Sequence, residues 1–358
     1  MKLNNLPINL DPNHEQFFTK FREIITQNSQ IKQLQKVFVN QQGLVLKNGL
    51  LVYGCAFNLR GKKDNTFYFN FWRKTIEQYF VCKFGTSLKS INLEDDRNYL
   101  LIHSAWFNYS FWVNSFLIRL ITAIKDKASS NLCLLYPEEW DSIPYVKESL
   151  TYFDIPIQLI PKDHHIFVKN LIMPTTRELT NSFDSASIRF VYDWFSFLDT
   201  SINPTRRIYL TRKKRNLRCV DNEIELVEVL KKYNFEVMSF EDLSFTEQIK
   251  TMFQCSHFIS IHGAGFSNIM FMHNNTSVFE FINYEYAKIE YTFPFWKLAD
   301  SLNLYYYYQF GNVKNKSNEN LIKNNNYDLH KDYLVNQNIY IEMIQFEKNL
   351  NLMLSNSQ

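Results

Sequence analysis

The sequence predicts a two-domain α/β protein built on parallel sheets. The chain has 358 residues, which suits two domains of ordinary size better than a single core. From residue 99 onward, short apolar runs typical of strands alternate with segments that have the apolar spacing of helices. One apolar run, 259–261, leads directly into a glycine loop and a further helical pattern. This alternation is typical of a doubly wound sheet.

The composition is that of a globular protein with no general preference for nucleic acid. Hydrophobic residues make up 46% of the chain, with 32 Phe and 21 Tyr, and the net charge of +3 is nearly balanced. Residues 1–11 contain no apolar segment of signal-peptide length, and no run reaches the roughly 18 apolar residues of a transmembrane helix. We therefore expect a cytoplasmic protein, and we leave open a peripheral contact with the inner face of a membrane.

Five cysteines are scattered along the chain without C-x-x-C or paired spacing, at 55, 82, 133, 219 and 255. This pattern predicts reduced thiols, mostly in cores, with neither disulfides nor structural zinc. Such cysteine usage agrees with residence in the cytosol.

Residues 1–173 are predicted to form a first domain that contains a small antiparallel β element. Three short β-type runs at 36–39, 44–46 and 50–53 are separated by Gly43 and by Asn48-Gly49, and Asn-Gly between apolar runs indicates a hairpin. The other elements expected here are helices at 14–26, 71–84, 109–124 and 138–150, and strands at 99–103, 132–136 and 155–160.

A stretch rich in Pro, Thr, Ser and Asn marks a linker at 174–187, and residues 188–312 predict a second domain with a parallel sheet. Ser244 and Asn222 each precede a Glu by three residues, which indicates helix starts. Residues 313–358 are expected to form an Asn- and Lys-rich connection and a last helix at 339–354. The second domain is expected to contain strands 207–210, 235–238, 258–261, 277–282 and 304–308, and helices 223–232, 245–253, 266–272 and 285–302.

The glycine loop at 262–265 is the strongest candidate for a ligand site. Gly263 and Gly265 flank Ala264, so the backbone is expected to take positive φ and to bring its N–H groups close to a ligand. A helix that opens after the loop adds unpaired N–H groups and a positive dipole end, which favour a phosphate. A bare G-x-G is a weak signal, and a strand-to-helix turn without a ligand is the alternative.

Other polar residues are expected to meet this loop at the carboxyl ends of the strands. Arg212 follows the first strand of the second domain, His262 ends the third and Glu280 lies in the fourth, so guanidinium, loop N–H groups and carboxylate would meet the phosphates and ribose of a nucleotide. Two structural alternatives stay open: Glu280 buried against Arg212, and His262 as a core histidine with satisfied hydrogen bonds.

A basic run between 206 and 218 invites a nucleic-acid interpretation. No recognised nucleic-acid module surrounds it, and basic loops at strand ends serve phosphorylated small ligands equally well. We therefore predict no nucleic-acid partner. Arg212 and Arg218 are candidates for phosphate binding, and solvated surface charge is the alternative for the run as a whole.

An ordered set of motifs resembles glycosyltransferase family 61. The set consists of Arg-Ile-Tyr-Leu-Thr-Arg at 207–212, Arg218, Asn-Glu at 222–223, Leu-Ser-Phe-Thr-Glu-Gln at 243–248, His-Gly-Ala-Gly-Phe-Ser-Asn at 262–268, and Val-Phe-Glu-Phe at 278–281. The order and spacing of the whole set make the resemblance specific. It is firm from about 206 to 282, weaker over 101–120, and leaves the first hundred residues and the tail largely uncovered.

This resemblance implies a GT-B-like fold with two Rossmann-like domains facing a cleft. It implies an inverting transferase that moves a sugar from a nucleotide-sugar donor to a glycan or lipid-linked glycan acceptor, needs neither cofactor nor catalytic metal, and, in its bacterial branch, serves capsular or surface polysaccharide synthesis. The residues at which the chain matches the family's donor site are Arg212, Arg218, Gly263, Ala264, Gly265, Asn268 and Glu280, with His262 as a catalytic candidate.

The first domain departs from the family pattern at its cleft-facing helix. Asn108, Tyr109 and Trp112 match and are acceptor-side candidates, but Phe111 and Ser115 stand where the family often has His and an acidic residue. If either missing group is the base, another residue must replace it. His103, at the end of the preceding strand, is the nearest candidate, and a partly buried polar residue is its alternative interpretation.

Two functions from other classes compete with glycosyl transfer. The His-Gly-Ala-Gly loop resembles the oxyanion loop of esterases, but no G-x-S-x-G nucleophile elbow occurs in the chain, which argues against a hydrolase. A catalytically inactive nucleotide-sugar or glycan-binding protein of the same fold is the stronger alternative, because Phe111 and Ser115 replace polar groups.

Overall fold

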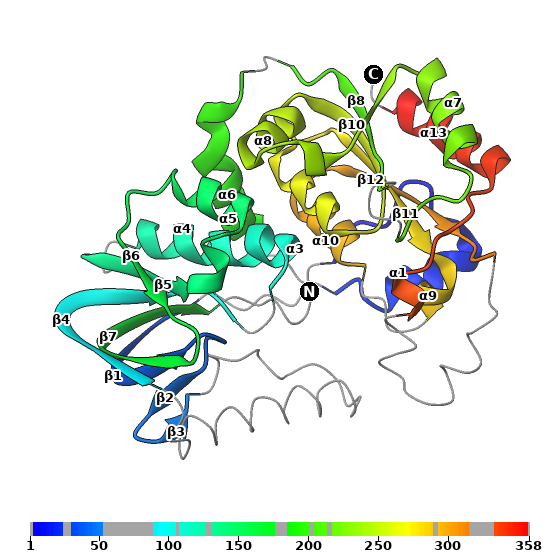
Figure 1. Ribbon diagram of the computed structural model, residues 1–358. Helices are drawn as coiled ribbons and strands as arrows, with labels where there is room; N and C mark the ends of the chain where they lie inside the picture. Colours follow the sequence, from blue (N-terminus) through cyan, green and yellow to red (C-terminus); the bar gives the residue numbers. More distant parts are fainter. Residues whose placement is uncertain are drawn as a thin grey trace. The chain divides into compact units, whose positions relative to one another are not determined.

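The protein divides into two compact units, which are described one at a time (Figure 1). The N-terminal unit comprises residues 26–180, and the C-terminal unit comprises residues 1–25 and 181–358. The computed structural model describes residues 3–23, 30–52, 89–104, 107–126, 130–175, 185–200, 203–212, 217–288, 293–314 and 333–356. The predicted helix at 71–84, most of the Asn- and Lys-rich stretch, Cys55 and Cys82 lie outside these residues.

The N-terminal unit is built on a mixed sheet in the order β3-β2-β1-β7-β4-β5-β6. Strands β4, β5, β6 and β7 pair with one another in parallel, whereas β1 pairs antiparallel with β2 and β7. Asn48 and Gly49 both have positive φ, 51° and 72°, which confirms the predicted Asn-Gly hairpin between β2 and β3. The strands are β1 (Gln30–Asn40), β2 (Val45–Lys47), β3 (Leu50–Leu51), β4 (Lys89–Leu101), β5 (Leu132–Pro137), β6 (Ile157–Ile160) and β7 (His164–Thr175).

Strand β7 was not expected from the sequence, although it joins the two parts of this sheet. It pairs along its length with β1, from Gln30↔Thr175 to Asn40↔His165, and on its other side with β4. The apolar residues of one sheet face, including Val39 and Leu135, form a buried cluster. The β element is therefore continuous with the parallel strands.

The expected helix at 109–124 contains a break in its hydrogen-bonding pattern. It consists of α3 (Tyr109–Phe111), a π-helical turn (Trp112–Phe116) and α4 (Leu117–Lys125). The expected helix at 138–150 is likewise divided into a 3-10 turn (Glu138–Trp140) and α5 (Pro144–Leu150). Pro144 explains the second division, because proline lacks an N–H and is tolerated in the first turn of a helix rather than in its interior.

The C-terminal unit confirms the predicted five-stranded parallel sheet. Its strand order is β12-β11-β10-β8-β9, which in chain order from the β9 edge is 2-1-3-4-5. Chain connections therefore reverse direction between β8 and β10, and open sheets of this order bind ligands at that switch point. The strands are β8 (Arg206–Leu210), β9 (Phe235–Met238), β10 (Cys255–Ile261), β11 (Ser277–Asn283) and β12 (Tyr305–Gly311).

Helices cover both faces of this sheet (Figure 1). On one face, α7 (Glu223–Lys232) and α13 (Met343–Ser355) pack in one cluster with strand residues such as Ile259 and Phe279. On the other face lies the 3-10 helix η8 (Ala264–Phe271), whose Phe266 ring lies 5.3 Å from Phe258 and 5.1 Å from Phe295. Other helices that the structure describes in this unit are α1 (Glu15–Thr19), α6 (Ser185–Phe195), α8 (Phe245–Phe253), α9 (Tyr284–Lys288) and α10 (Pro294–Ser301), with short 3-10 turns at Pro12–His14, Ser196–Leu198 and Phe240–Asp242.

The two capping patterns have different outcomes. Ser244 and Glu247 form a capping box at the start of α8, as predicted. Asn222 makes no capping hydrogen bond; its carboxamide instead binds the main-chain N–H and C=O of Ile341, at 3.0 and 2.8 Å. Helix α7 nevertheless begins at Glu223, as predicted, and the Asn222 side chain links the start of this helix to the C-terminal segment.

The described cysteines are free thiols, as expected. Cys133 and Cys255 are buried, and Cys219 is partly buried. Burial raises the pKa of the Cys133, Cys219 and Cys255 thiols. All three are therefore held in the unreactive protonated form.

The N-terminal segment contacts the edge strand β12, although the sequence suggested that residues 1–173 form one domain. The N–H of Ile8 donates to the Tyr306 carbonyl at 3.0 Å. The carboxamide of Asn9 binds both main-chain groups of Tyr308, at 2.7 and 3.1 Å. These contacts satisfy polar groups that an edge strand would otherwise present to solvent. In this part of the chain, the helix expected at 14–26 is limited to α1 and the turn before it.

Phe18 anchors this segment, so we expect its truncation to destabilise the C-terminal unit. Its side chain is fully buried, with ring centroids 4.4 Å from Phe293 and 5.1 Å from Trp296. Phe18→Ala should lower the free energy of unfolding by about 3–5 kcal/mol, as for other buried Phe truncations. Urea titration followed by tryptophan fluorescence measures this change. Ile344→Ala is the control, because Ile344 is 82% exposed; equal losses in both variants would contradict the anchoring role.

Candidate functional site

Arg212 and Gly263 meet at the switch point of the C-terminal sheet. Arg212 follows β8 and Gly263 follows β10, the two strands between which the chain connections reverse. A Cβ atom added to Gly263 would lie 2.1 Å from Nη1 of Arg212. The guanidinium group therefore occupies the space that a side chain would take, and any residue larger than glycine would displace it.

The glycines serve close approach, and the predicted positive φ was wrong. Gly263 is extended, with φ of 170°, and Gly265 is likewise outside the left-handed region. A Cβ at Gly265 would lie 2.7 Å from a methyl group of Leu210 on β8. Ala264 begins η8, which is a 3-10 helix and starts two residues before the helix expected at 266–272. Leu210 at the end of β8 therefore lies against Gly265, and Arg212, just after β8, lies against Gly263.

Asn268 stabilises the glycine loop through a buried hydrogen bond. It is fully buried, and its side-chain N–H groups donate to the Gly265 carbonyl at 3.1 Å and to Gln248 at 3.2 Å. Gln248 in turn donates to the carbonyls of Phe240 and Leu243. Two of the family-like motifs are therefore joined by one hydrogen-bond network, and contact of Asn268 with a donor stays a prediction.

His262 is held by a buried carboxylate. Its Nδ1 lies 2.6 Å from Glu280 Oε1, and the Tyr306 hydroxyl donates to Glu280 Oε2 at 2.5 Å. The His262 side chain is 16% exposed, whereas that of Glu280 is fully enclosed. The main-chain N–H of His262 also extends the β10–β11 ladder by donating to Phe281 O at 2.8 Å. Both the backbone and the ring of His262 are thus fixed.

These contacts give Glu280 a role that sequence reasoning did not assign. It was expected to bind a ribose, with burial against Arg212 as the alternative; the observed partners are His262 and Tyr306. Tyr306 was missed altogether, because it was counted only as part of a strand. The available signal was a tyrosine run at 305–308 beside an acidic residue in the neighbouring strand. Direct contact of Glu280 with a donor stays a prediction.

Strand β8 is tied at its carboxyl end by Glu223. The hydroxyls of Tyr209 and Thr211 both donate to Glu223 Oε1, at 2.8 and 2.6 Å. Burial, followed by the nearby Glu223 charge, raises the pKa of Tyr209. The hydrogen bond to Glu223 fixes Thr211, which immediately precedes Arg212. These motif residues therefore help to position the Arg212 guanidinium.

Arg218 contacts the C-terminal segment. Its backbone is left-handed, with φ of 55°, and its Nε donates to the Asn336 side chain at 3.2 Å. Its main-chain N–H donates to the Asn336 carbonyl at 3.3 Å. Arg218 therefore has a structural role in holding the C-terminal segment. Its contact with a phosphate stays a prediction.

The acceptor-side candidates of the N-terminal unit have structural contacts. Asn108 caps α3 by accepting the Phe111 N–H at 3.0 Å. Trp112 is fully buried and donates through Nε1 to Ser149 at 2.9 Å, and the Tyr109 ring lies edge-on to another tyrosine. Each of these three motif residues therefore has a structural contact within the protein. Their binding of an acceptor substrate stays a prediction.

The two departures from the family pattern lie at the π-helical turn. Phe111 precedes the turn, and Ser115 lies within it and is buried. Single π-helical turns inside α-helices are frequent at functional sites. The π-helical turn is therefore consistent with a functional role for this segment, although most side chains of the turn are apolar.

His103 is a buried, neutral histidine. It is 1% exposed, and its Nε2 lies 3.1 Å from the Gln41 carbonyl. Arg119 donates to the carbonyl of the preceding residue, Ile102, at 2.9 Å. Burial lowers the pKa of His103 to about 3. A side chain with that pKa is a weak proton acceptor at neutral pH, which favours the alternative interpretation over a catalytic base.

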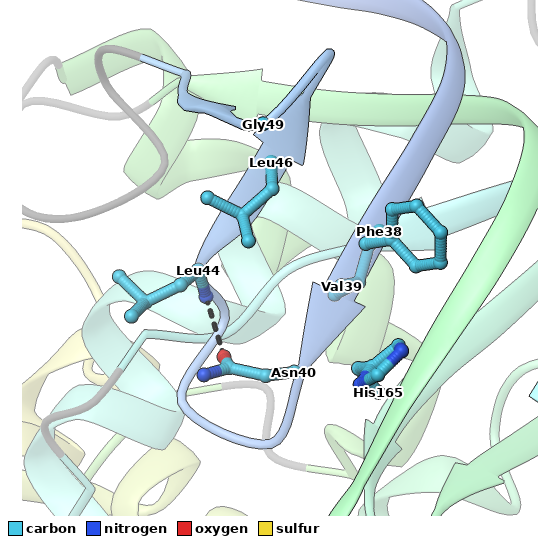
Figure 2. A pocket seen from close by; sticks show the side chains of 7 residues that line it. All are labelled: Phe38, Val39, Asn40, Leu44, Leu46, Gly49 and His165. Atoms are coloured by element: carbon cyan, nitrogen blue, oxygen red, sulfur yellow. Dashed lines mark hydrogen bonds between the residues drawn. The ribbon is translucent and has the colours of Figure 1, made fainter. Parts of the chain in front are cut away.

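A cavity of about 200 Å³ lies in the N-terminal unit between β1, β2 and β7 (Figure 2). Its walls are mainly apolar, with Phe38, Leu44 and Leu46 among them. The Asn40 carboxamide accepts the Leu44 N–H at 2.9 Å, and burial, together with neighbouring His164, lowers the pKa of His165. The lining residues include no lysine or arginine. The cavity is therefore unsuited to a diphosphate.

Comparison with known proteins agrees with the motif set. The model of the family Glycosyltransferase 61 matches residues 106–279, a range that includes the π-helical turn, Arg212 and the glycine loop. No curated protein matches the chain. Residues 106–279 thus match glycosyltransferase family 61.

Proposed function

We propose that the protein transfers a sugar from a nucleotide-sugar donor to a glycan acceptor with inversion and without a catalytic metal. The observation that carries the proposal is the Arg212 guanidinium held against the Gly263 backbone at the switch point. A fixed cation at the carboxyl ends of parallel strands suits the diphosphate of such a donor. The match of residues 106–279 to a glycosyltransferase family supports the reaction class.

The reaction would be a direct displacement. The acceptor oxygen forms a bond to the anomeric carbon while the bond from that carbon to the diphosphate oxygen breaks, and the electron pair leaves with the diphosphate. Negative charge grows on the leaving group, so a preorganised cation stabilises the transition state more than the ground state. Loss of one such group typically costs about 2.7–4 kcal/mol in activation free energy.

His262 is the better supported of the two histidines as the base. It is partly exposed next to Gly263, whereas the low pKa of His103 makes that residue a poor proton acceptor.

The cellular role is proposed on weaker support. A GT-B arrangement, a glycan or lipid-linked acceptor, and capsular or surface polysaccharide synthesis on the cytoplasmic side of a membrane all rest on the family resemblance. Among the described helices, each one is too short or too polar to cross a membrane.

An inactive binding protein is the second candidate, favoured by Phe111 and Ser115. Release of free nucleotide diphosphate from a panel of sugar nucleotides, with and without glycan acceptors, separates the two. A protein that binds a donor but never releases nucleotide diphosphate with any acceptor would support the second candidate.

Arg212→Ala should weaken diphosphate binding while leaving nucleoside binding unchanged. A charge-assisted hydrogen bond contributes about 1.5–3 kcal/mol, so we expect a loss of about 10- to 150-fold in affinity for a nucleotide diphosphate. Calorimetric titration with nucleoside and nucleotide diphosphate measures both affinities. Arg207→Ala is the matched control, because Arg207 lies on the same strand and binds the Tyr233 carbonyl. Equal losses for nucleoside and diphosphate would contradict phosphate binding by Arg212.

Gly263→Ala should also weaken diphosphate binding, because the new methyl group would displace the Arg212 guanidinium. Gly265→Ala is its control: the methyl group there would meet Leu210, a flexible apolar side chain that carries no charge. We expect Gly265→Ala to lower the melting temperature with little change in affinity. If both variants bind the diphosphate as the wild type does, the close approach has no part in donor binding.

Activity should be the same in EDTA as in added magnesium or manganese. The reason is that Arg212 and the loop N–H groups would take the place of a metal at the leaving diphosphate. Rates of nucleotide release after metal chelation measure this. Activity that EDTA abolishes and manganese restores would overturn metal independence.

A further inference from the structure

Two side chains converge on the Glu280 carboxylate at the edge of the candidate site. The Tyr306 O–H donates to Oε2 at 2.5 Å, and Nδ1 of His262 lies 2.6 Å from Oε1. Glu280 lies on β11 and Tyr306 on β12, both on the sheet face that also carries Phe258 and η8. The carboxylate is enclosed, so its oxygens depend on these protein donors rather than on solvent.

The carboxylate determines where the His262 proton lies. An ionised carboxylate is an acceptor only, so Nδ1 of His262 must carry the hydrogen that Oε1 receives. In neutral imidazole the other nitrogen, Nε2, then has the lone pair. Tyr306 reinforces this state, because its own proton is directed to the second oxygen of the same carboxylate.

We propose that Glu280 and Tyr306 are positioning residues that hold His262 in the Nδ1–H tautomer, so that Nε2 receives the proton of the acceptor hydroxyl. The proposal rests on the proposed function. In the transfer, the acceptor O–H bond breaks and its proton goes to Nε2. The acceptor oxygen bonds to the anomeric carbon, and the electron pair of the old bond leaves with the diphosphate. His262 then returns the proton to water, and the negative Glu280 stabilises the transient imidazolium.

The surroundings of His262 keep the ring in this orientation. Phe295 of α10 lies 5.2 Å from the ring and Tyr286 of α9 lies 6.3 Å away, both tilted. Arg212 lies against the next residue in the chain, Gly263. The imidazole is therefore held at Nδ1 by a carboxylate and lies one residue from the glycine that contacts the guanidinium.

The test measures the tautomer directly, by nitrogen-15 NMR of histidine-labelled full-length protein. The His262 signals are assigned by their loss in His262→Gln. We expect a protonated Nδ1 and a lone pair on Nε2 in the neutral wild-type side chain. Glu280→Gln should reverse this, because Tyr306 will continue to donate to the carboxamide oxygen, which turns the NH₂ group toward Nδ1. A wild-type Nε2–H tautomer, or an unchanged tautomer in Glu280→Gln, would overturn the proposal.

Kinetics provide a second readout that a merely structural role would not move. Glu280→Gln should lower kcat about 10²- to 10⁴-fold, the usual loss of general-base catalysis, with the KM for the donor little changed. Tyr307→Phe is the matched control, because Tyr307 is adjacent in β12 and its hydroxyl contacts Asn356 rather than Glu280. A rise in KM at constant kcat in Glu280→Gln would instead indicate direct donor binding and refute the positioning role.

Tyr306→Phe keeps the test decisive if Glu280→Gln fails to fold. In Tyr306→Phe the hydrogen bond from the tyrosine hydroxyl to Glu280 is lost, whereas the contact with His262 is kept. The Nδ1 proton resonance should therefore move downfield while the tautomer stays the same. An unmoved resonance would contradict the coupling of the three side chains. Wild-type protein that shows the Nδ1–H tautomer but turns over no sugar nucleotide would refute the proposed function and, with it, proton transfer at Nε2. Activity with an Nε2–H tautomer would refute only the positioning role.

Discussion

The close approach of Arg212 to the Gly263 backbone is the constraint around which the C-terminal unit is arranged. It requires β8 and β10 to be neighbours, a residue without a side chain at 263, and a β8 end that does not shift. Glu223 satisfies the last condition by accepting hydrogen bonds from the hydroxyls of Tyr209 on β8 and Thr211 just after it. The position of the positive charge is thus set by strand geometry and by a missing Cβ atom.

Periodicity was sufficient to predict the parallel sheet and most element positions in the C-terminal unit, because each strand there is a short apolar run between amphipathic helices. The Asn-Gly hairpin and the Ser244 capping box were equally local signals. Strand β7 was missed, because its sequence runs into the Pro- and Thr-rich stretch that was assigned to a linker. The start of α7 after Asn222 was predicted, but the contact of the Asn222 carboxamide with Ile341 was not, because Ile341 lies more than a hundred residues away in the chain.

The candidate site was predictable by position but not by contact. The rule for strand ends selected Arg212 and His262 correctly as neighbours of one loop, since it depends only on chain order. It could not show that Gly263 makes room for a guanidinium instead of adopting positive φ. Nor could it show that Glu280 faces His262 and Tyr306, because that depends on which side chains of adjacent strands share a face. Contacts of this kind arise from tertiary register, which no local pattern specifies.

The pairing of the N-terminal segment with β12 has a consequence for the order of assembly during synthesis. Asn9 and its partner Tyr308 are separated by 299 positions in the chain. At about 5–20 residues per second, a ribosome needs roughly 15–60 s to make the intervening chain. For most of that time the rings of Phe293, Trp296 and Tyr308, which contact Phe18, have not yet been made, so this segment reaches its final place long after its own synthesis.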